Sequence, residues 1–381
     1  MPVEKALTLV AGALDGSGDA LLPVPPDDPS GDRLAALEPL SPLRPGEDDD
    51  ADPTALVLAT SGSTGVPKGA LLHRSALVSS ARATHARLGG PGTWLLALAA
   101  HHVAGVQVLV RSLVAGTEPE VLDLASGFHT AAFVEATARL RQRAAGRRYT
   151  SLVPTQLSRL LDAGPDAVDA LGSFDAALVG GQATPPLMVE RARAAGVRLV
   201  TTYGMSETCG GCVYDGSPLD GVDVRCADDG RVSIAGPVLA RGYRLRPADP
   251  AFANGWFCTD DIGTLDGGTL RIVGRADDVL VTGGLKVSPS TIEAVLADLP
   301  QVREGVVVGI ADAEWGQIVV AVVVPREPSV PPTLQQVRAF VAARLGPESA
   351  PRHLVVIDRL PTRGPGKPDR QALVAMLDAE R

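Results

Sequence analysis

The feature that most constrains this chain is a ten-residue stretch, Thr60 to Gly69, with the sequence Thr-Ser-Gly-Ser-Thr-Gly-Val-Pro-Lys-Gly. It follows a short apolar run, Ala55 to Ala59, which is typical of a buried strand. The glycines let backbone N–H groups approach a ligand closely, and the hydroxyls and Lys68 supply further donors. The stretch therefore predicts a polyphosphate cradle at the end of a strand, with a flexible Gly/Ser surface loop as the alternative.

This stretch is not an ordinary P-loop. The pattern Gly-x4-Gly-Lys-Ser/Thr cannot be placed on it, because Pro67 stands where the second glycine belongs and Gly69 follows the lysine. The donors of the predicted cradle are Thr60, Ser61, Gly62, Ser63, Thr64, Gly65 and Lys68.

Composition narrows the class of protein. A net charge of −9 argues against a nucleic-acid surface, which needs a basic stripe. We see no signal peptide at Met1, and no apolar run approaches the ~20 residues that span a bilayer. Four cysteines do not form a disulfide framework, so a reducing cytoplasm is expected. Cys209 and Cys212 could form half of a zinc site or a redox pair, but we interpret them as small apolar residues beside a pocket.

The hydrophobic pattern predicts an α/β fold with a large N-terminal domain and a small C-terminal one. Apolar runs alternate with helical stretches up to about residue 203, which favours mainly parallel sheets flanked by helices. Residues 70–87 are expected to be helical, and the acidic run 47–52 to be solvated. Short strands from residue 211, one of them at 239–243, predict an antiparallel β subdomain. Domains 1–276 and 277–381 are expected, the second of them α+β.

Five separated stretches need a common explanation. They are the loop at 60–69, Tyr203-Gly-Met-Ser-Glu-Thr208, Thr259-Asp-Asp261, Gly274-Arg-Ala-Asp-Asp278 and Gly366-Lys-Pro-Asp-Arg370. In order and rough spacing they resemble the core motifs of the adenylate-forming superfamily of acyl-CoA synthetases, adenylation domains and luciferases. The resemblance runs from about residue 55 to residue 370.

The resemblance implies an ATP site with Mg²⁺. Residues 60–69 would wrap the β- and γ-phosphates, and Glu207 would be both a catalytic residue and the Mg²⁺ ligand. Asp261 would accept the ribose hydroxyls with help from Arg275. The remaining nucleotide contacts would come from Gly180, Gly181, Tyr203 and Ser206.

The resemblance also implies a mobile C-terminal domain. Lys367 matches the catalytic lysine that meets the α-phosphate and the carboxylate in the first half-reaction, where an ammonium stabilises developing negative charge. Asp277 matches the hinge about which the domain moves before coenzyme A enters to form the thioester. The alternative for Lys367 is a solvated residue of the C-terminal tail.

Two departures from the family pattern stand out. Asp260 replaces the glycine of the usual Thr-Gly-Asp, and only about 54 residues precede the loop, far fewer than in longer members. That shortness and the segments at 100–113 and 151–161 look like the compact o-succinylbenzoate–CoA ligases of menaquinone biosynthesis. His102 would then lie at the acyl pocket, although a packed histidine remains the alternative.

Three functions stay open on the sequence. The first is an ATP- and Mg²⁺-dependent acyl-CoA ligase acting on o-succinylbenzoate with coenzyme A, with small-molecule partners and a possible homodimer. The second is an aryl or aminoacyl adenylation domain that loads a carrier protein. The third is a catalytically inactive nucleotide-binding module, which the joint presence of Lys367, Glu207 and Asp261 argues against.

Replacing Lys367 by Ala should abolish adenylation and leave thioester formation from a supplied acyl-adenylate largely intact, because the lysine acts only in the first half-reaction. Pyrophosphate release and thioester formation would be measured separately. Equal loss of both would contradict the two-arrangement mechanism.

Overall fold

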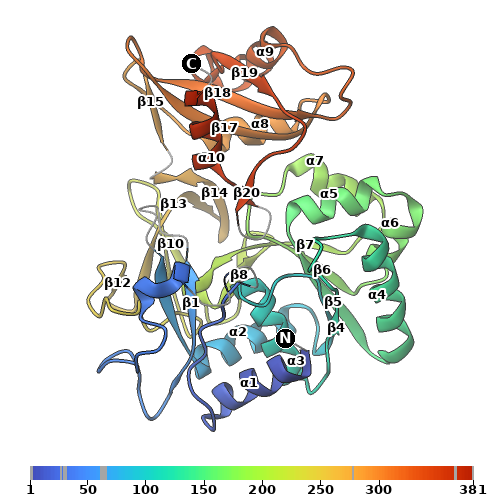
Figure 1. Ribbon diagram of the computed structural model, residues 1–381, viewed down its shortest axis with the longest axis vertical. Helices are drawn as coiled ribbons and strands as arrows, with labels where there is room; N and C mark the ends of the chain where they lie inside the picture. Colours follow the sequence, from blue (N-terminus) through green and yellow to red (C-terminus); the bar gives the residue numbers. More distant parts are fainter. Residues whose placement is uncertain are drawn as a thin grey trace.

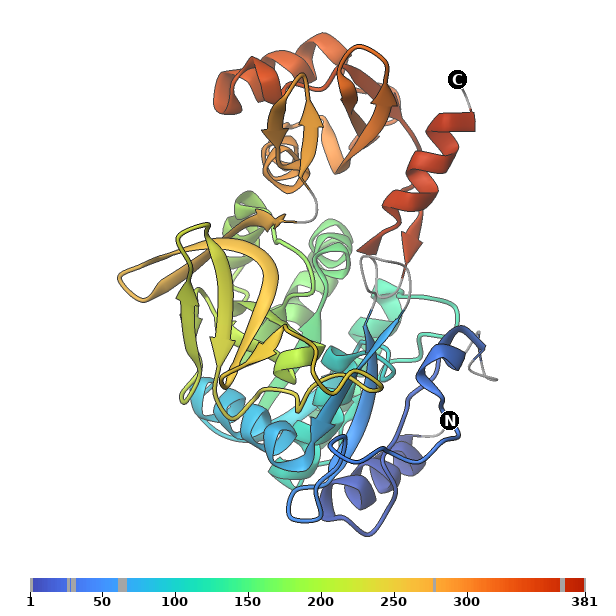
Figure 2. The ribbon, with the colours of Figure 1, turned by 90° about the vertical axis from the view of Figure 1, so that its left-hand side faces the viewer.

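The computed structural model describes residues 3–25, 28, 32–60, 67–276, 279–363 and 367–379. It confirms the predicted α/β class. Figures 1 and 2 show a large body made by the N-terminal and central parts of the chain, with a smaller unit of C-terminal residues above it. None of the helices in these ranges has the length and apolar character that a membrane span requires.

The body is built on a seven-stranded sheet. Its strands run in the order β4 (Glu120–Val121), β3 (Gly92–Leu96), β5 (Arg147–Leu152), β6 (Ala176–Val179), β7 (Leu199–Met205), β8 (Gly210–Tyr214) and β9 (Ser217–Pro218). Neighbours from β4 to β7 are parallel, and β8 and β9 are added antiparallel. This order matches the alternation read from the sequence.

Helices cover both faces of this sheet (Figure 1). One face packs against α4 (Thr130–Arg143), α5 (Pro154–Asp162), α6 (Pro165–Gly172) and α7 (Pro186–Ala194). The other face packs against α2 (Arg74–Arg87) and α3 (Val103–Ala115). Neighbouring strand residues divide between the two cores, as the two-residue period of a strand requires: Trp94 faces α2 and α3, and Leu95 faces α4.

The predicted phosphate loop joins the two strands of a hairpin, β1 (Thr54–Thr60) and β2 (Lys68–His73), which pairs Thr60 with Lys68. Our expected helix at 70–87 was therefore wrong at its start. The first four residues lie in β2 because Ala70 bonds across to β1 and Leu71 exchanges hydrogen bonds with the segment around Gly242. The helix begins only at Arg74.

The antiparallel β subdomain contains β10 (Asp223–Cys226), β11 (Arg231–Ala235), β12 (Phe252–Ala253), β13 (Trp256–Asp266) and β14 (Thr269–Arg275). The expected strand at 239–243 was wrong. Among its described residues only Tyr243 makes isolated bridges, to Ala70 of β2 and to Arg246, so the segment lies beside β2 without forming a strand.

The residues before β1 are more ordered than their weak pattern suggests. They form α1 (Val3–Asp15), which packs on the α2–α3 side of the core, and a short 3₁₀ helix, η1 (Asp32–Leu37). The acidic run 47–52 is solvated only in part. Glu47 is buried against Arg244, with Nη1 and Oε2 3.4 Å apart, and Asp52 lies 2.7 Å from His73. Each carboxylate contacts a basic side chain that is distant from it in the sequence.

The C-terminal unit is a separate sheet with helices on both faces. Its strands are β15 (Leu280–Thr282), β16 (Leu285–Val287), β17 (Val302–Asp312), β18 (Gly316–Pro325) and β19 (His353–Val356). Helices α8 (Pro289–Ala297) and α9 (Leu334–Leu345) pack on one face, and α10 (Arg370–Ala379) on the other. A short hairpin of β20 (Thr362–Arg363) and β21 (Lys367–Pro368) precedes α10; a 3₁₀ turn, η4 (Pro347–Ser349), follows α9.

Replacing Arg244 by Met should destabilise the body by about 3–5 kcal/mol, because it leaves the buried Glu47 carboxylate without its counter-charge. Arg244 also donates to the carbonyls of Leu37, Glu38 and Ser41. Urea denaturation would measure the change. Arg139→Gln, which breaks a surface pair with Glu120, should cost less than about 1 kcal/mol, and equal losses would contradict this reading.

Candidate active site

One tyrosine links the β1–β2 hairpin to the predicted metal ligand. We call this hairpin, residues 54–73, the phosphate hairpin because it carries the predicted phosphate loop. The Tyr243 hydroxyl donates to Glu207 Oε1 at 2.7 Å, and Lys68 Nζ lies 4.7 Å above the centre of the same ring. Lys68 Nζ is also 3.7 Å from Asp249 Oδ2. Thr60 and Lys68, the two ends of the loop, are thus held beside Glu207; Ser61, Gly62, Ser63, Thr64 and Gly65 lie outside the described residues.

Glu207 lies in a short 3₁₀ turn, η2 (Ser206–Thr208), directly after β7. The turn is fixed by Thr208, whose Oγ1 accepts the Met205 N–H at 3.0 Å and donates to the Gly210 carbonyl at 2.7 Å. Glu207 is 7% exposed, and its backbone carbonyl accepts the Ala240 N–H. Burial and the Glu207 carboxylate raise the pKa of Tyr243, so the phenol stays a neutral donor to that carboxylate.

A hard oxygen ligand of this kind suits Mg²⁺. In the ranges that the structure covers, no group of three or more His, Cys, Asp or Glu side chains could hold a metal ion. Mg²⁺ bound by proteins usually takes one or two carboxylates and completes its shell with phosphate oxygens and water. Glu207 beside the phosphate hairpin fits that donor set.

The second part of the site joins β7 to the β subdomain. The Tyr203 hydroxyl donates to Asp261 Oδ2 at 2.7 Å. Asp261 on β13 pairs in register with Arg275 on β14, and Arg275 Nη1 lies 3.6 Å from Asp261 Oδ1. Thr259 Oγ1 accepts the Asp261 N–H at 3.0 Å and so orients the peptide. Burial raises the pKa of Tyr203, and Asp261 raises it further, so this phenol is also a neutral donor.

Asp260, which replaces the glycine of the usual Thr-Gly-Asp motif, contacts Arg231 and Arg275. Its side chain is 54% exposed, against 14% for Asp261, and lies 3.0 Å from Arg231 Nη1 and 3.7 Å from Arg275 Nη2. Asp260 lies within β13 and is not among the described residues with positive φ. The position therefore makes no conformational demand for glycine.

The glycine pair after β6 has a steric explanation. A Cβ on Gly180 would lie 2.2 Å from Thr202 Oγ1 on β7, and Gly181 has φ +82°. Gly180 is required where two strands approach closely, and Gly181 where the chain turns at the carboxyl edge of the sheet. Both lie at the strand edge where open α/β sheets bind ligands.

His102 lies at the start of α3, half-buried, with its ring centre 4.1 Å from that of His101. Gly105, in the first turn of α3, packs against the segment that leads into the helix. A Cβ on Gly105 would lie 2.2 Å from the Ala99 carbonyl oxygen, so only glycine fits there. A Cβ on Gly210, just beyond η2, would lie 3.7 Å from Val103 Cγ2. The first turn of α3 is therefore beside the Glu207 segment.

Sequence reasoning missed a buried polar group deeper on α3. Arg111 is 3% exposed, lies 5.0 Å over the Trp94 ring and 3.4 Å from the Tyr214 hydroxyl, and makes no ion pair with any carboxylate in the part of the chain described. Its Nε and both amide atoms of buried Gln107 have no hydrogen-bond partner among the described residues. The available signal was the four-residue spacing of Gln107 and Arg111 in an otherwise apolar helix. Tyr243 and Asp249 were also missed.

Cys209 and Cys212 are separate, fully buried thiols. Burial raises the pKa of both, that of Cys212 to about 12. Neutral thiols are poor nucleophiles and metal ligands, which agrees with their interpretation as small apolar residues.

The C-terminal residues of the predicted site are placed only in part. Lys367 is the first residue of β21, but its side chain and the whole of Asp277 lie outside the described parts of the structure. In both ribbon views the β20–β21 hairpin is on the side of the C-terminal unit that faces the body.

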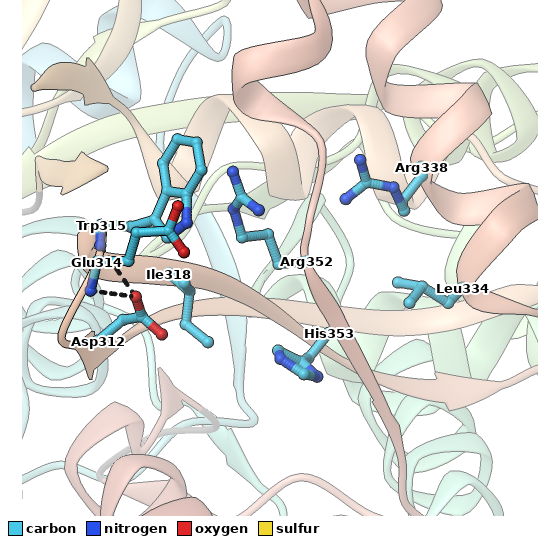
Figure 3. A pocket seen from close by; sticks show the side chains of 8 residues that line it. All are labelled: Asp312, Glu314, Trp315, Ile318, Leu334, Arg338, Arg352 and His353. Atoms are coloured by element: carbon cyan, nitrogen blue, oxygen red, sulfur yellow. Dashed lines mark hydrogen bonds between the residues drawn. The ribbon is translucent and has the colours of Figure 1, made fainter. Parts of the chain in front are cut away.

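A surface pocket of about 420 Å³ lies in the C-terminal unit, and Figure 3 shows its side chains. Arg352 stacks 3.6 Å from the Trp315 ring, with Arg338 and the carboxylates of Asp312 and Glu314 nearby. It contains no predicted site residue, and its two carboxylates balance its two guanidiniums, so it is not the phosphate site.

Comparison with known proteins identifies the class. The AMP-binding enzyme family matches residues 18–252, and the AMP-binding enzyme C-terminal domain matches residues 291–367. A Mycobacterium tuberculosis protein named "Probable 2-succinylbenzoate–CoA ligase" is 47% identical over 388 residues, covering 100% of this chain and 98% of that protein. The 2-succinylbenzoate–CoA ligase of Bacillus licheniformis is 30% identical over 370 residues, which cover 89% of this chain and 73% of that protein.

Solved structures agree. The o-succinylbenzoate CoA synthetase (MenE) of Bacillus subtilis, in complex with the acyl-adenylate intermediate OSB-AMP, matches with a TM-score of 0.72 and 28% identity over 84% of this chain and 69% of that one. The same enzyme has been solved with ATP and magnesium ion. ATP-bound MatB from Rhodopseudomonas palustris matches with a TM-score of 0.75 and 26% identity, covering 86% and 69%. The chain belongs to the AMP-binding enzyme family, which confirms the resemblance seen in its motifs.

Replacing Asp261 by Asn should raise the KM for ATP about 10-fold or more, because a carboxylate that is only 14% exposed and is predicted to accept two ribose hydroxyls would make strong, charge-assisted hydrogen bonds. Asp260→Asn should change it less than about 3-fold, since that exposed side chain pairs with Arg231. Pyrophosphate release at varied ATP would measure both. The reverse order would mean that Asp260 is the ribose ligand.

Proposed function

We propose that this chain is an ATP- and Mg²⁺-dependent ligase that adenylates o-succinylbenzoate and then forms its coenzyme A thioester, in menaquinone biosynthesis. The observation that carries the proposal is the placement of Tyr203 and Glu207, four residues apart, at the end of β7. One contacts the Asp261–Arg275 pair, and the other contacts the phosphate hairpin through Tyr243. A nucleotide bound between them would meet a ribose acceptor at one end and a phosphate and Mg²⁺ site at the other.

In the proposed adenylation step, different residues would bind the ribose, the phosphates and Mg²⁺. Asp261, held by Tyr203 and Arg275, would accept the ribose hydroxyls, and Gly180, Gly181 and Ser206 would lie along the nucleotide. Lys68 and the loop from Thr60 would hold the leaving pyrophosphate. Mg²⁺, held by Glu207, would neutralise charge on the phosphates as the carboxylate attacks.

Lys367 would supply a cation at the α-phosphate. We propose Asp277 as the hinge between a domain of residues 1–276 and a mobile domain of residues 277–381. Movement about it would withdraw Lys367 after adenylation and admit coenzyme A. A cytoplasmic location and a homodimer remain predictions.

The acid is proposed from the relatives' names and from the polar group on α3. o-Succinylbenzoate carries two carboxylates, one on its succinyl chain and one on its ring, and we propose that the succinyl one is adenylated. The other needs a counter-ion in the acyl pocket. Arg111 is a buried guanidinium without an anionic partner among the described residues, two turns of α3 beyond the first turn, where His102 and Val103 lie. Arg111 would pair with the ring carboxylate, and His102 would contact the acid near the reacting end. This favours a dianionic acid over the amino acids loaded by carrier-dependent adenylation domains.

Pyrophosphate release with o-succinylbenzoate, benzoate, fatty acids and amino acids tests the function directly. We expect release only with o-succinylbenzoate, followed by thioester formation on coenzyme A. Release with an amino acid and no transfer to coenzyme A would instead support the carrier-loading function. No release with any acid would support an inactive nucleotide-binding module.

Arg111→Met should raise the KM for o-succinylbenzoate about 30-fold or more, because truncating one partner of a buried charge pair costs ~2–5 kcal/mol. The KM for ATP should change less than about 3-fold. Arg139→Met on the surface of α4 is the control. An unchanged KM for the acid would place the ring carboxylate elsewhere.

A further inference from the structure

A charged pair in the C-terminal unit lies three residues from Lys367. Arg370, the first residue of α10, contacts Glu293 on α8 with two parallel bonds, Nη1 to Oε1 at 2.6 Å and Nη2 to Oε2 at 3.0 Å. The two side chains are 33% and 20% exposed. A two-pronged contact of this kind fixes orientation as well as distance, which a single-point surface pair does not.

The pair also bonds to the backbone of an edge strand. Strand β17 ends the order of its sheet, so the N–H and carbonyl groups on its outer side have no partner strand among the described residues. Glu293 Oε1 accepts the Val307 N–H at 2.7 Å, and Arg370 Nη1 lies 3.4 Å from the Val307 carbonyl oxygen. One ion pair thus satisfies both free backbone groups of a β17 residue.

Helices α8 and α10 lie on opposite faces of this sheet. Ile292 and Leu296 of α8 belong to one core, and Leu373 and Leu377 of α10 belong to the other. The Glu293–Arg370 pair reaches around the open edge of β17 and joins the two helices there. We name this arrangement the edge clamp.

The edge clamp connects a helix close to the proposed hinge with the helix that follows Lys367. Helix α8 follows the β15–β16 hairpin, which comes just after the proposed hinge, and α10 follows the β20–β21 hairpin with Lys367. Because Asp369 is the single residue between β21 and α10, the direction of α10 sets the direction of the Lys367 strand. The apolar contacts of α10 hold it on the sheet, and the clamp fixes its first residue.

We infer that Glu293 and Arg370 are positioning residues for Lys367: the edge clamp aims the β20–β21 hairpin, so adenylation requires it and thioester formation does not. The inference rests on the proposed function. A displacement of about 1 Å at a reacting group costs as much as ~100-fold in rate, so a clamp distant from the nucleotide can still control the first step.

The test compares full-length Arg370→Gln, Arg370→Lys and Glu293→Gln with the parent chain. Loss of the clamp should lower kcat for pyrophosphate release with o-succinylbenzoate about 10–100-fold and change the KM for ATP and for the acid less than about 3-fold. Thioester formation from supplied acyl-adenylate and coenzyme A should change less than about 3-fold. Arg370→Lys, which keeps the charge but not the two-pronged geometry, should recover part of the loss.

Two further measurements distinguish a loss of Lys367 orientation from a general destabilisation of the C-terminal unit. Arg303→Gln breaks a β17 surface pair with Glu304 at 3.5 Å and should leave both half-reactions unchanged. Hydrogen exchange at the Val307 amide should quicken in Glu293→Gln, because that N–H loses an ionised acceptor.

Parallel loss of both half-reactions, or clamp variants with full pyrophosphate release, would overturn the inference while the proposed function stands. A parent chain that releases no pyrophosphate would overturn the proposed function and the inference with it.

Discussion

The phosphate side of the site depends on a segment that has no helix or strand of its own, residues 240–244. Ala240 donates its N–H to the Glu207 carbonyl, Arg241 and Gly242 exchange hydrogen bonds with Leu71, and the Arg244 N–H donates to the Gly69 carbonyl. Tyr243 adds its side-chain bond to Glu207. The segment therefore ties the phosphate hairpin to the end of β7, and the buried Arg244–Glu47 pair fixes the segment itself.

The two carboxylates of the site are held by the same device. A tyrosine hydroxyl donates to each at 2.7 Å, Tyr203 to Asp261 and Tyr243 to Glu207. Because burial raises the pKa of both phenols, each tyrosine orients its carboxylate without neutralising it. A lysine or arginine in the same place would cancel the negative charge that the proposed ribose and Mg²⁺ sites require. Arg275, at 3.6 Å and half-exposed, is a weaker and more screened partner.

Features that depend on neighbouring residues could be predicted from the sequence, and features that depend on residues distant in the chain could not. The alternation of strands and helices is local, so the parallel sheet was correctly predicted. The motif at 203–208 supplies Tyr203 and Glu207, which contact two other parts of the chain. Residues 70–73 look helical by composition, and only β1 and the 240–244 segment, distant in sequence, make them a strand. Glu47 and Arg244 are 197 residues apart, so nothing near either indicated a buried pair. Arg111 was detectable as a charge on an apolar helix, but its missing partner could be seen only in the structure.

Asp260 replaces the family's glycine and so places a second carboxylate next to Asp261, the proposed ribose ligand. Carboxylates on neighbouring residues repel, and that repulsion would weaken the hold on Asp261 unless it were offset. The two side chains differ in exposure, 54% for Asp260 and 14% for Asp261; Arg231 Nη1 lies 3.0 Å from Asp260, and Arg275 lies within 3.7 Å of both. Two guanidiniums thus balance two carboxylates. Charge pairing across three strands, β11, β13 and β14, therefore offsets the second carboxylate, at a point where the β11–β13 register is irregular.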